Sequence, residues 1–139
     1  MASNPQFAAL PQTKLITLST ATVGVKTNPA TGSTLLITGT STVGYAGTKI
    51  TTIAAKAQAT NTASTLLIFI TDTTGVVSTG ILFDEVLISA ITSSTTAASA
   101  RSFNIYTDLQ LMPGQAVYVS CTIATNAVPL NVFVSAGDF

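Results

Sequence analysis

The chain has 139 residues, of which five are basic and five acidic, so its formal net charge at pH 7 is zero. A charged share of 7%, against a usual share of about 25%, excludes the clustered basic side chains with which proteins hold nucleic acid. The absence of histidine and the single cysteine exclude a histidine base, a Ser-His-Asp triad, an internal disulfide and a cysteine-based zinc site.

The apolar runs of the chain are short. The longest, residues 66–70, is far below the ~18 residues of a membrane-spanning helix. The first residues also lack the basic and then apolar segments of a secretory signal. We therefore expect a protein made and kept in a cytoplasm, with no membrane and no nucleic acid among its partners.

Residues 1–12 are predicted to form an extended N-terminal arm. Pro5 and Pro11 bracket Phe7 and Leu10, and proline holds its neighbours in extended conformations. We expect Phe7 and Leu10 to be partner-binding anchors. A disordered terminus explains the same residues equally well. The rest of the chain, residues 13–139, is predicted to be one β-sandwich domain.

Short strand-like segments separated by turn residues fill this domain. Threonine and serine make up 39 of the 139 residues, and β-branched threonine favours strands. The predicted strands cover residues 14–18, 35–38, 48–55, 65–71, 81–91, 103–111, 117–124 and 130–134. A short helix over residues 53–57 is a competing interpretation. About eight strands without a long helix predict an all-β, antiparallel, jelly-roll-like sandwich.

Several strands carry finer predictions. Ile50 and Ile53 are three residues apart, whereas a strand repeats every two, so we expect a bulge between them. Residues 65–71 are apolar on both faces and predict a central strand covered on both sides. Residues 103–111 alternate apolar with polar side chains, which predicts one buried and one wet face. Cys121 lies on the apolar side of its strand and is expected to be a buried thiol.

Turn chemistry is clear at two places. Residues 72–75 begin with aspartate and end with glycine, and Pro113-Gly114 has the order of a type II turn. Residues 27–32 and 92–100 are predicted loops, because they are rich in small, polar or turn-forming residues.

Few residues could carry chemistry. Asp84 and Glu85 are neighbours on a predicted strand, so their side chains point to opposite faces and cannot share a site as acid and base. The glycine spacing of residues 39–44 is that of a phosphate loop, but Tyr45 and Ala46 stand where lysine and serine or threonine are needed. We expect no enzyme, cofactor or metal. Tyr106 and Tyr118, on polar faces, are candidate partner-binding residues that could stack on a sugar.

Several packing and turn patterns over residues 13–139 resemble those of small tailed-bacteriophage virion proteins of the capsid decoration, or cement, type. They are Gly47–Ile53, the stretch from Ala57 to Ser64, Leu66–Ile70, Leu82–Val86, Ala90–Ser94, the Leu-x-Leu-x-Pro-Gly run from Leu109, and the terminal Gly137-Asp138-Phe139. The proteins that this chain resembles often have a basic residue where it has Leu67, so an ion pair with Glu85 that the resemblance would imply is not expected here.

The resemblance implies a structural phage protein on the capsid exterior, forming a homotrimer and binding the major capsid protein across capsomer joints. An arm and rigid strands suit such a mechanical task, because added buried surface stabilises a shell. The alternative function is a receptor- or carbohydrate-binding sandwich of a phage head or tail fibre. An enzyme that uses Glu85 with a second carboxylate is the least favoured interpretation.

Overall fold

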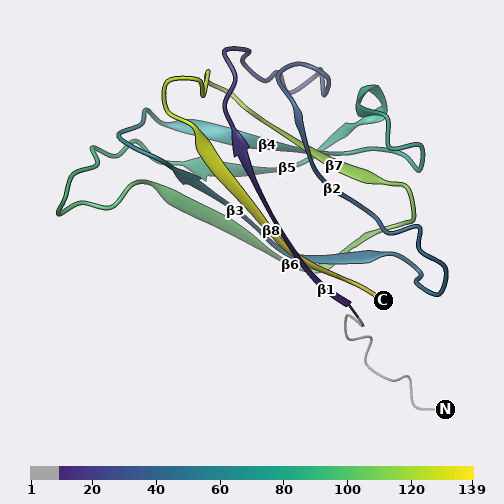
Figure 1. Ribbon diagram of the computed structural model, residues 1–139. Coiled ribbons are helices and arrows are strands. Elements are labelled where there is room, and N and C mark those ends of the chain that lie inside the picture. Colours follow the sequence, from purple (N-terminus) through teal and green to yellow (C-terminus); the bar gives the residue numbers. More distant parts are fainter. Residues whose placement is uncertain (1–9) are drawn as a thin grey trace.

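The computed structural model describes residues 10–139, so the predictions for residues 1–9, including Phe7, lie outside the described residues. Two layers of strands face each other (Figure 1). The elements are β1 (Leu10–Leu18), β2 (Thr34–Thr38), β3 (Thr48–Ala57), β4 (Ser64–Ile70), the 3₁₀ turn η1 (Val77–Thr79), β5 (Ile81–Ile88), β6 (Arg101–Leu111), β7 (Ala116–Cys121) and β8 (Leu130–Asp138).

The strand order is that of a jelly roll. One antiparallel sheet has the order β1-β8-β3-β6 and the other β2-β7-β4-β5. Every connection between consecutive strands passes from one sheet to the other, except the one from β4 to β5. The prediction of an all-β sandwich of about eight strands is confirmed.

Strand β1 begins earlier than predicted. Leu10 and Pro11, which we expected at the end of the arm, pair with Asp138 and Gly137 of β8. Because β1 is an edge strand, Pro11 can lie in it without removing a hydrogen bond that the sheet needs. The competing helix over residues 53–57 is wrong, since these residues continue β3.

A bulge in β3 confirms the one predicted from the spacing of Ile50 and Ile53. The register shifts between Ile50 and Thr52 against both neighbouring strands. Opposite this bulge, β6 advances by four residues, from Leu109 to Ile105, while β3 advances by two. Because of these extra residues, the side chains of the first half of β6 point to the opposite faces from those that a regular strand would give them.

The prediction for the faces of residues 103–111 is therefore wrong in part. Leu109 is buried, but Phe103 and Ile105 are exposed, and the polar Asn104 and Tyr106 are partly buried instead. The alternation of buried and exposed side chains does not continue through β6, because the irregularity changes which face the odd-numbered residues occupy before and after it.

Strand β4 is covered on both sides, as predicted. Its Leu66 and Ile68 belong to the core between the sheets. Leu67 and Phe69 point to the outside of the sheet and are still fully buried. Residues 19–33 lie over this outer face: the Gly24 amide donates to the Cys121 carbonyl at 2.7 Å, and Ser120 leaves no room for a side chain at position 24.

The predicted turns are present. The Asp72 carboxylate accepts from the Thr74 amide at 2.9 Å, and the Gly75 amide donates to the Asp72 carbonyl at 3.1 Å. Gly75 and Gly114 both have positive φ, at 70° and 88°, which is the conformation that a glycine in these turns supplies.

Candidate interaction surface

The outer face of the β1-β8-β3-β6 sheet carries one apolar residue from each of its four strands. Register places Leu15 beside Phe133, Phe133 beside Ala54, and Ala54 beside Phe103. We call these four residues the apolar row. With strands about 4.8 Å apart, it spans ~14 Å. Leu15 is 63% and Phe103 51% exposed, so both ends of the row are open to solvent, while between them Phe133 is partly exposed and Ala54 is buried.

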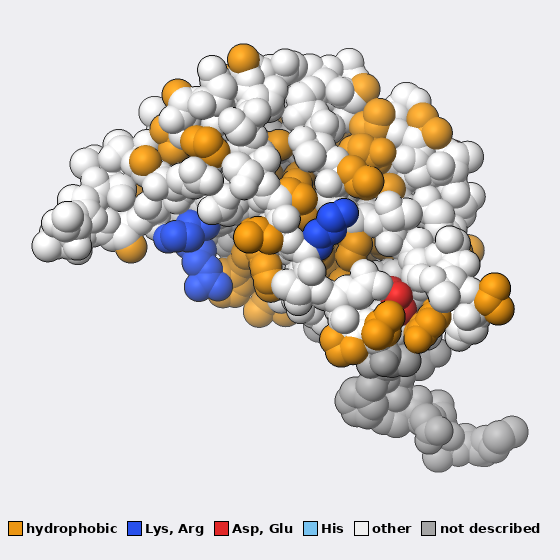
Figure 2. Space-filling view, viewed as in Figure 1, with side chains coloured by type: hydrophobic (Ala, Val, Ile, Leu, Met, Phe, Trp, Pro, Cys, Tyr) orange, Lys and Arg blue, Asp and Glu red, His pale blue; other side chains and the backbone are white. Residues whose placement is uncertain are grey.

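Two further rows flank the apolar row. On one side register aligns Thr17, Asn131, Lys56 and Arg101, which we call the basic row. On the other side it aligns Thr13, Ser135, Thr52 and Ile105, the neutral row. None of these residues is acidic. Figure 2 shows hydrophobic and basic side chains next to each other on this side of the molecule.

A depression of about 360 Å³ lies where the apolar and basic rows meet. Its lining includes Leu15 and Phe133 together with Ala54, Lys56 and Arg101. The alanine is small, so the larger side chains around it leave a hollow. The guanidinium carbon of Arg101 lies 5.5 Å from the centre of the Phe103 ring, a cation–π distance that holds the arginine over the apolar row.

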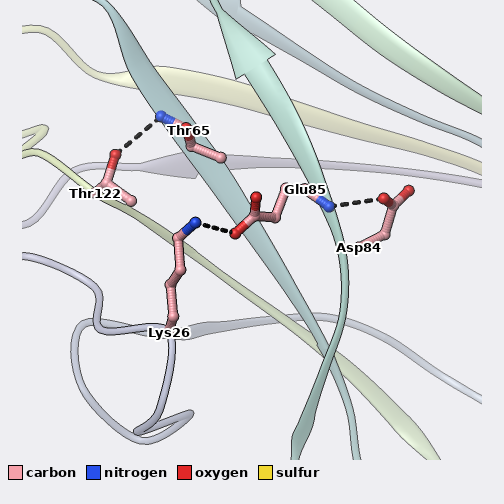
Figure 3. A network of polar contacts seen from close by, with 5 residues as sticks. All are labelled: Lys26, Thr65, Asp84, Glu85 and Thr122. Atoms are coloured by element: carbon pink, nitrogen blue, oxygen red, sulfur yellow. Dashed lines mark hydrogen bonds and ion pairs between the residues drawn. The ribbon is translucent and has the colours of Figure 1, made fainter.

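The opposite side of the sandwich is different, because residues 19–33 of the chain lie over part of it. Within this cover, Lys26 reaches β5 and pairs with Glu85 at 2.6 Å (Figure 3). Leu67 lies directly across from Glu85 but carries no charge, so the partner of Glu85 comes from residues 19–33 and not from the neighbouring strand. Lys26–Glu85 is the one ion pair within residues 10–139.

Asp84 points the other way and ties the two sheets together, so the prediction that Asp84 and Glu85 face opposite sides is confirmed (Figure 3). Its Oδ2 accepts from Asn104 Nδ2 and from the Tyr106 hydroxyl, both at 2.7 Å. Its Oδ1 accepts from the Glu85 amide at 2.8 Å. These bonds join β5 to β6 at the edge of the sandwich.

The hydrogen bonds decide the ionisation of this group. Burial by itself raises the pKa of Asp84, but the bonds from Tyr106, the Glu85 amide and Asn104 outweigh it and hold the pKa below its ordinary value. Burial and the neighbouring Asp84 carboxylate raise the pKa of the Tyr106 hydroxyl. Asp84 is therefore ionised and Tyr106 neutral at neutral pH.

The structure does not bring the two candidate tyrosines together. Tyr106 points between the sheets toward Asp84. Tyr118 lies on β7 opposite Leu35 and Phe69, on the outside of the other sheet, and its hydroxyl donates to the Gly75 carbonyl at 3.3 Å. Leu10 is 48% exposed at the start of β1.

The residues of the apolar and basic rows are the ones that the sequence did not single out. They come from four strands that are far apart in the chain, and no local motif marks them. One signal in the sequence could have found them: Leu15 and Phe133 are apolar residues at strand positions that alternate with the core residues and are therefore expected to be polar.

The other chemical groups take no part in this surface. Cys121 is buried, as predicted. Over residues 10–139 no three side chains of the metal-binding types gather in one place. In the same part of the chain, no helix is long and apolar enough to cross a membrane.

Comparison with known proteins returned no match, either to a protein-family model or to a curated protein. The likeness to phage decoration proteins therefore stays a prediction from sequence patterns.

Proposed function

We propose that this chain is a structural protein of a phage virion, a capsid decoration protein that stabilises the head shell by binding the major capsid protein across capsomer joints. One observation carries the proposal: the outer face of the β1-β8-β3-β6 sheet bears an apolar row that is exposed at Leu15 and Phe103, whereas residues 19–33 of the chain lie over part of the other outer face. Contiguous exposed apolar side chains rimmed by polar ones are typical of protein–protein interaction sites.

The composition supports this function. Burying surface in an assembly is favourable by about 25 cal/mol per Å² of apolar area, before the losses of association are subtracted. Threonine and serine side chains in the neutral row lose less on leaving water than charged ones would. Three copies acting together as a homotrimer would each place one such face on the shell.

The arm is a second contact in the proposed assembly. We propose that Phe7 anchors it on a neighbouring subunit, where an extended segment can add to a free strand edge. The backbone of Leu10 is paired in β1, so Leu10 would contribute to this contact through its exposed side chain. Phe7→Ala is then expected to lower the occupancy of the particle while the melting temperature of the free protein stays unchanged.

The direct test is to locate the chain in an electron-microscopy map of the intact particle whose genome encodes it. We expect density on the shell exterior over the joints between capsomers. Particles made without the chain are expected to break at lower temperature, and adding the purified protein back is expected to restore their resistance. Density elsewhere, or equal heat resistance without the protein, would refute the proposal.

A second candidate function is carbohydrate binding, supported by an aromatic cluster at the β5–β6 edge. Phe83 is 48% exposed, packs against Tyr106 with ring centres 5.9 Å apart, and borders a depression of about 390 Å³ that also touches Asp108. Aromatic faces beside a few polar groups are typical of ligand sites. Saturable glycan binding that Phe83→Ala abolishes would favour this function, and an empty glycan array would exclude it.

A further inference from the structure

We infer that the depression between the apolar and basic rows receives a protein segment in which a carboxylate side chain stands next to an apolar one. This inference rests on the proposed function and adds the chemistry of the partner's surface. Its basis is the pair Lys56 and Arg101, which lie directly opposite each other on β3 and β6.

Like charges at directly opposed positions of two strands destabilise a sheet. Within residues 10–139 neither Lys56 nor Arg101 has an acidic partner, because the ion pair of that region joins Lys26 to Glu85. Both side chains are exposed. An anion bound between them would remove the repulsion, and a carboxylate matches the fork of the Arg101 guanidinium.

The hollow beside these cations is apolar. Leu15, Ala54 and Phe133 line it, and the cation–π contact with Phe103 keeps Arg101 over this surface. A simple anion would leave these side chains in water. A segment that presents an apolar side chain and a carboxylate together satisfies both halves of the site.

Other occupants fit less well. Nucleic acid is held by many phosphate contacts, whereas the three rows offer two cations. A second copy would have to supply carboxylates, and four of the five acidic side chains are engaged in this chain. Asp72 accepts from Thr74 and Thr79, Asp84 accepts from Asn104 and Tyr106, Glu85 pairs with Lys26, and the buried Asp138 accepts from Gln12 and Thr48.

The first experiment uses two small probes with the same apolar chain, octanoate and octylammonium, followed by NMR of the full-length protein. We expect octanoate to shift the amide signals of Ala54, Lys56, Arg101 and Phe133, and octylammonium to leave them in place. The double variant Lys56→Glu/Arg101→Glu is expected to reverse this preference. Shifts located elsewhere, or inorganic phosphate binding as tightly as octanoate, would overturn the inference.

The second experiment measures binding to shells that lack the protein. We expect the double charge reversal to weaken binding at least about tenfold, and Ile105→Ser to weaken it more than Leu87→Ser. Ile105 and Leu87 are matched, being 70% and 68% exposed, but Leu87 lies on the other sheet. Lys14→Glu is the charge control, because Lys14 is opposite the core residue Val134 and so points away from this face.

These outcomes separate the two proposals. If wild-type protein binds shells and the charge reversal leaves binding unchanged, the inference is wrong and the decoration function stands. If wild-type protein does not bind shells, the decoration function is wrong, and the probe experiment decides the inference. If the charge reversal instead dissociates a dimer in sedimentation, a second copy is the occupant and the inference is wrong. Melting temperatures equal to wild type show that the variants are folded.

Discussion

At the scale of single residues, Asp84 links the two sheets through its side chain. It is a partly buried carboxylate that accepts three hydrogen bonds and joins β5 to β6. A hydrogen bond to a charged group contributes about 1.5–3 kcal/mol, and exposure to solvent reduces that figure. Asp84 lies on the side of β5 that also carries the core residues Val86 and Ile88, and its partners on β6 explain why a carboxylate is tolerated there.

We expect Asp84→Asn to lower the free energy of unfolding by about 1–2 kcal/mol at pH 7. The amide that replaces one carboxylate oxygen is a donor and faces the donors of Asn104 and Tyr106. Urea denaturation measures the change. Asp108→Asn is the control, because Asp108 is exposed and has only a 3.4 Å contact with Thr107. Equal stability of the two variants would mean that the bonds to Asp84 contribute nothing.

The same group predicts a dependence on pH. Since the pKa of Asp84 is lowered in the folded protein, its stabilisation is present above the ordinary aspartate pKa of about 3.9 and is lost as pH falls through the lower, folded value. Below about pH 4, we expect the melting temperature of the wild-type protein to decrease more steeply with falling pH than that of Asp84→Asn. Parallel curves would contradict the assignment.

Substitutions of Gly114 and Gly44 distinguish the cost of backbone strain from the cost of steric crowding. Both have positive φ, at 88° and 99°, but a side chain at position 114 would collide with the Thr73 carbonyl, whereas nothing lies near position 44. We expect Gly44→Ala to destabilise the protein by about 1 kcal/mol and Gly114→Ala by ~2 kcal/mol or more, as measured by thermal unfolding. Equal losses would show that the turn after β6 can move away from residues 72–75.

At the scale of elements, the irregularity in β6 opposite the bulge of β3 divides β6 into two halves whose faces are reversed. Leu109 and Ile105 are four residues apart and would share a face in a regular strand. The structure buries Leu109 and leaves Ile105 70% exposed. The apolar row depends on this reversal, because it turns Phe103 to the outside.

Alanine substitutions at these two positions test the reversal. Leu109→Ala is expected to destabilise the protein by about 2–4 kcal/mol through the cavity it leaves, and Ile105→Ala by less than about 1 kcal/mol, as is usual for exposed side chains. Chemical denaturation gives both values. A loss at Ile105 as large as that at Leu109 would mean that β6 is regular and that Phe103 and Ile105 belong to the core.

At the scale of the whole molecule, the fold is made by contacts between distant parts of the chain. The first described strand, β1, pairs with the last, β8, and β3 pairs with both β6 and β8. Such pairings require long loops to close before they stabilise anything. The two outer faces also differ at this scale, since residues 19–33 lie over part of one sheet and not over the other.

We expect folding in milliseconds to seconds, because strand pairs of this separation form slowly. Stopped-flow refolding from urea measures the rate, with the proline-linked slow phase separated by double-jump mixing. Folding completed within microseconds would contradict the long-range pairing of β1 with β8.

The sequence by itself determined the features that depend on neighbouring residues. Its threonine content, its alternation and its turns predicted the all-β class, most strands, the bulge near Ile50 and the burial of Cys121, because strand period and turn chemistry are local. It also predicted that Asp84 and Glu85 face apart.

Only the tertiary structure decided where the surfaces lie. Leu15, Ala54, Phe103 and Phe133 meet because four strands pair in a particular register, and register between distant strands has no local signature. The same holds for the cover of residues 19–33 and for the pairing of Asp84 with Tyr106. Tyr106 was predicted to face solvent and points inward instead, because an irregularity in a strand shifts every side chain beyond it to the other face.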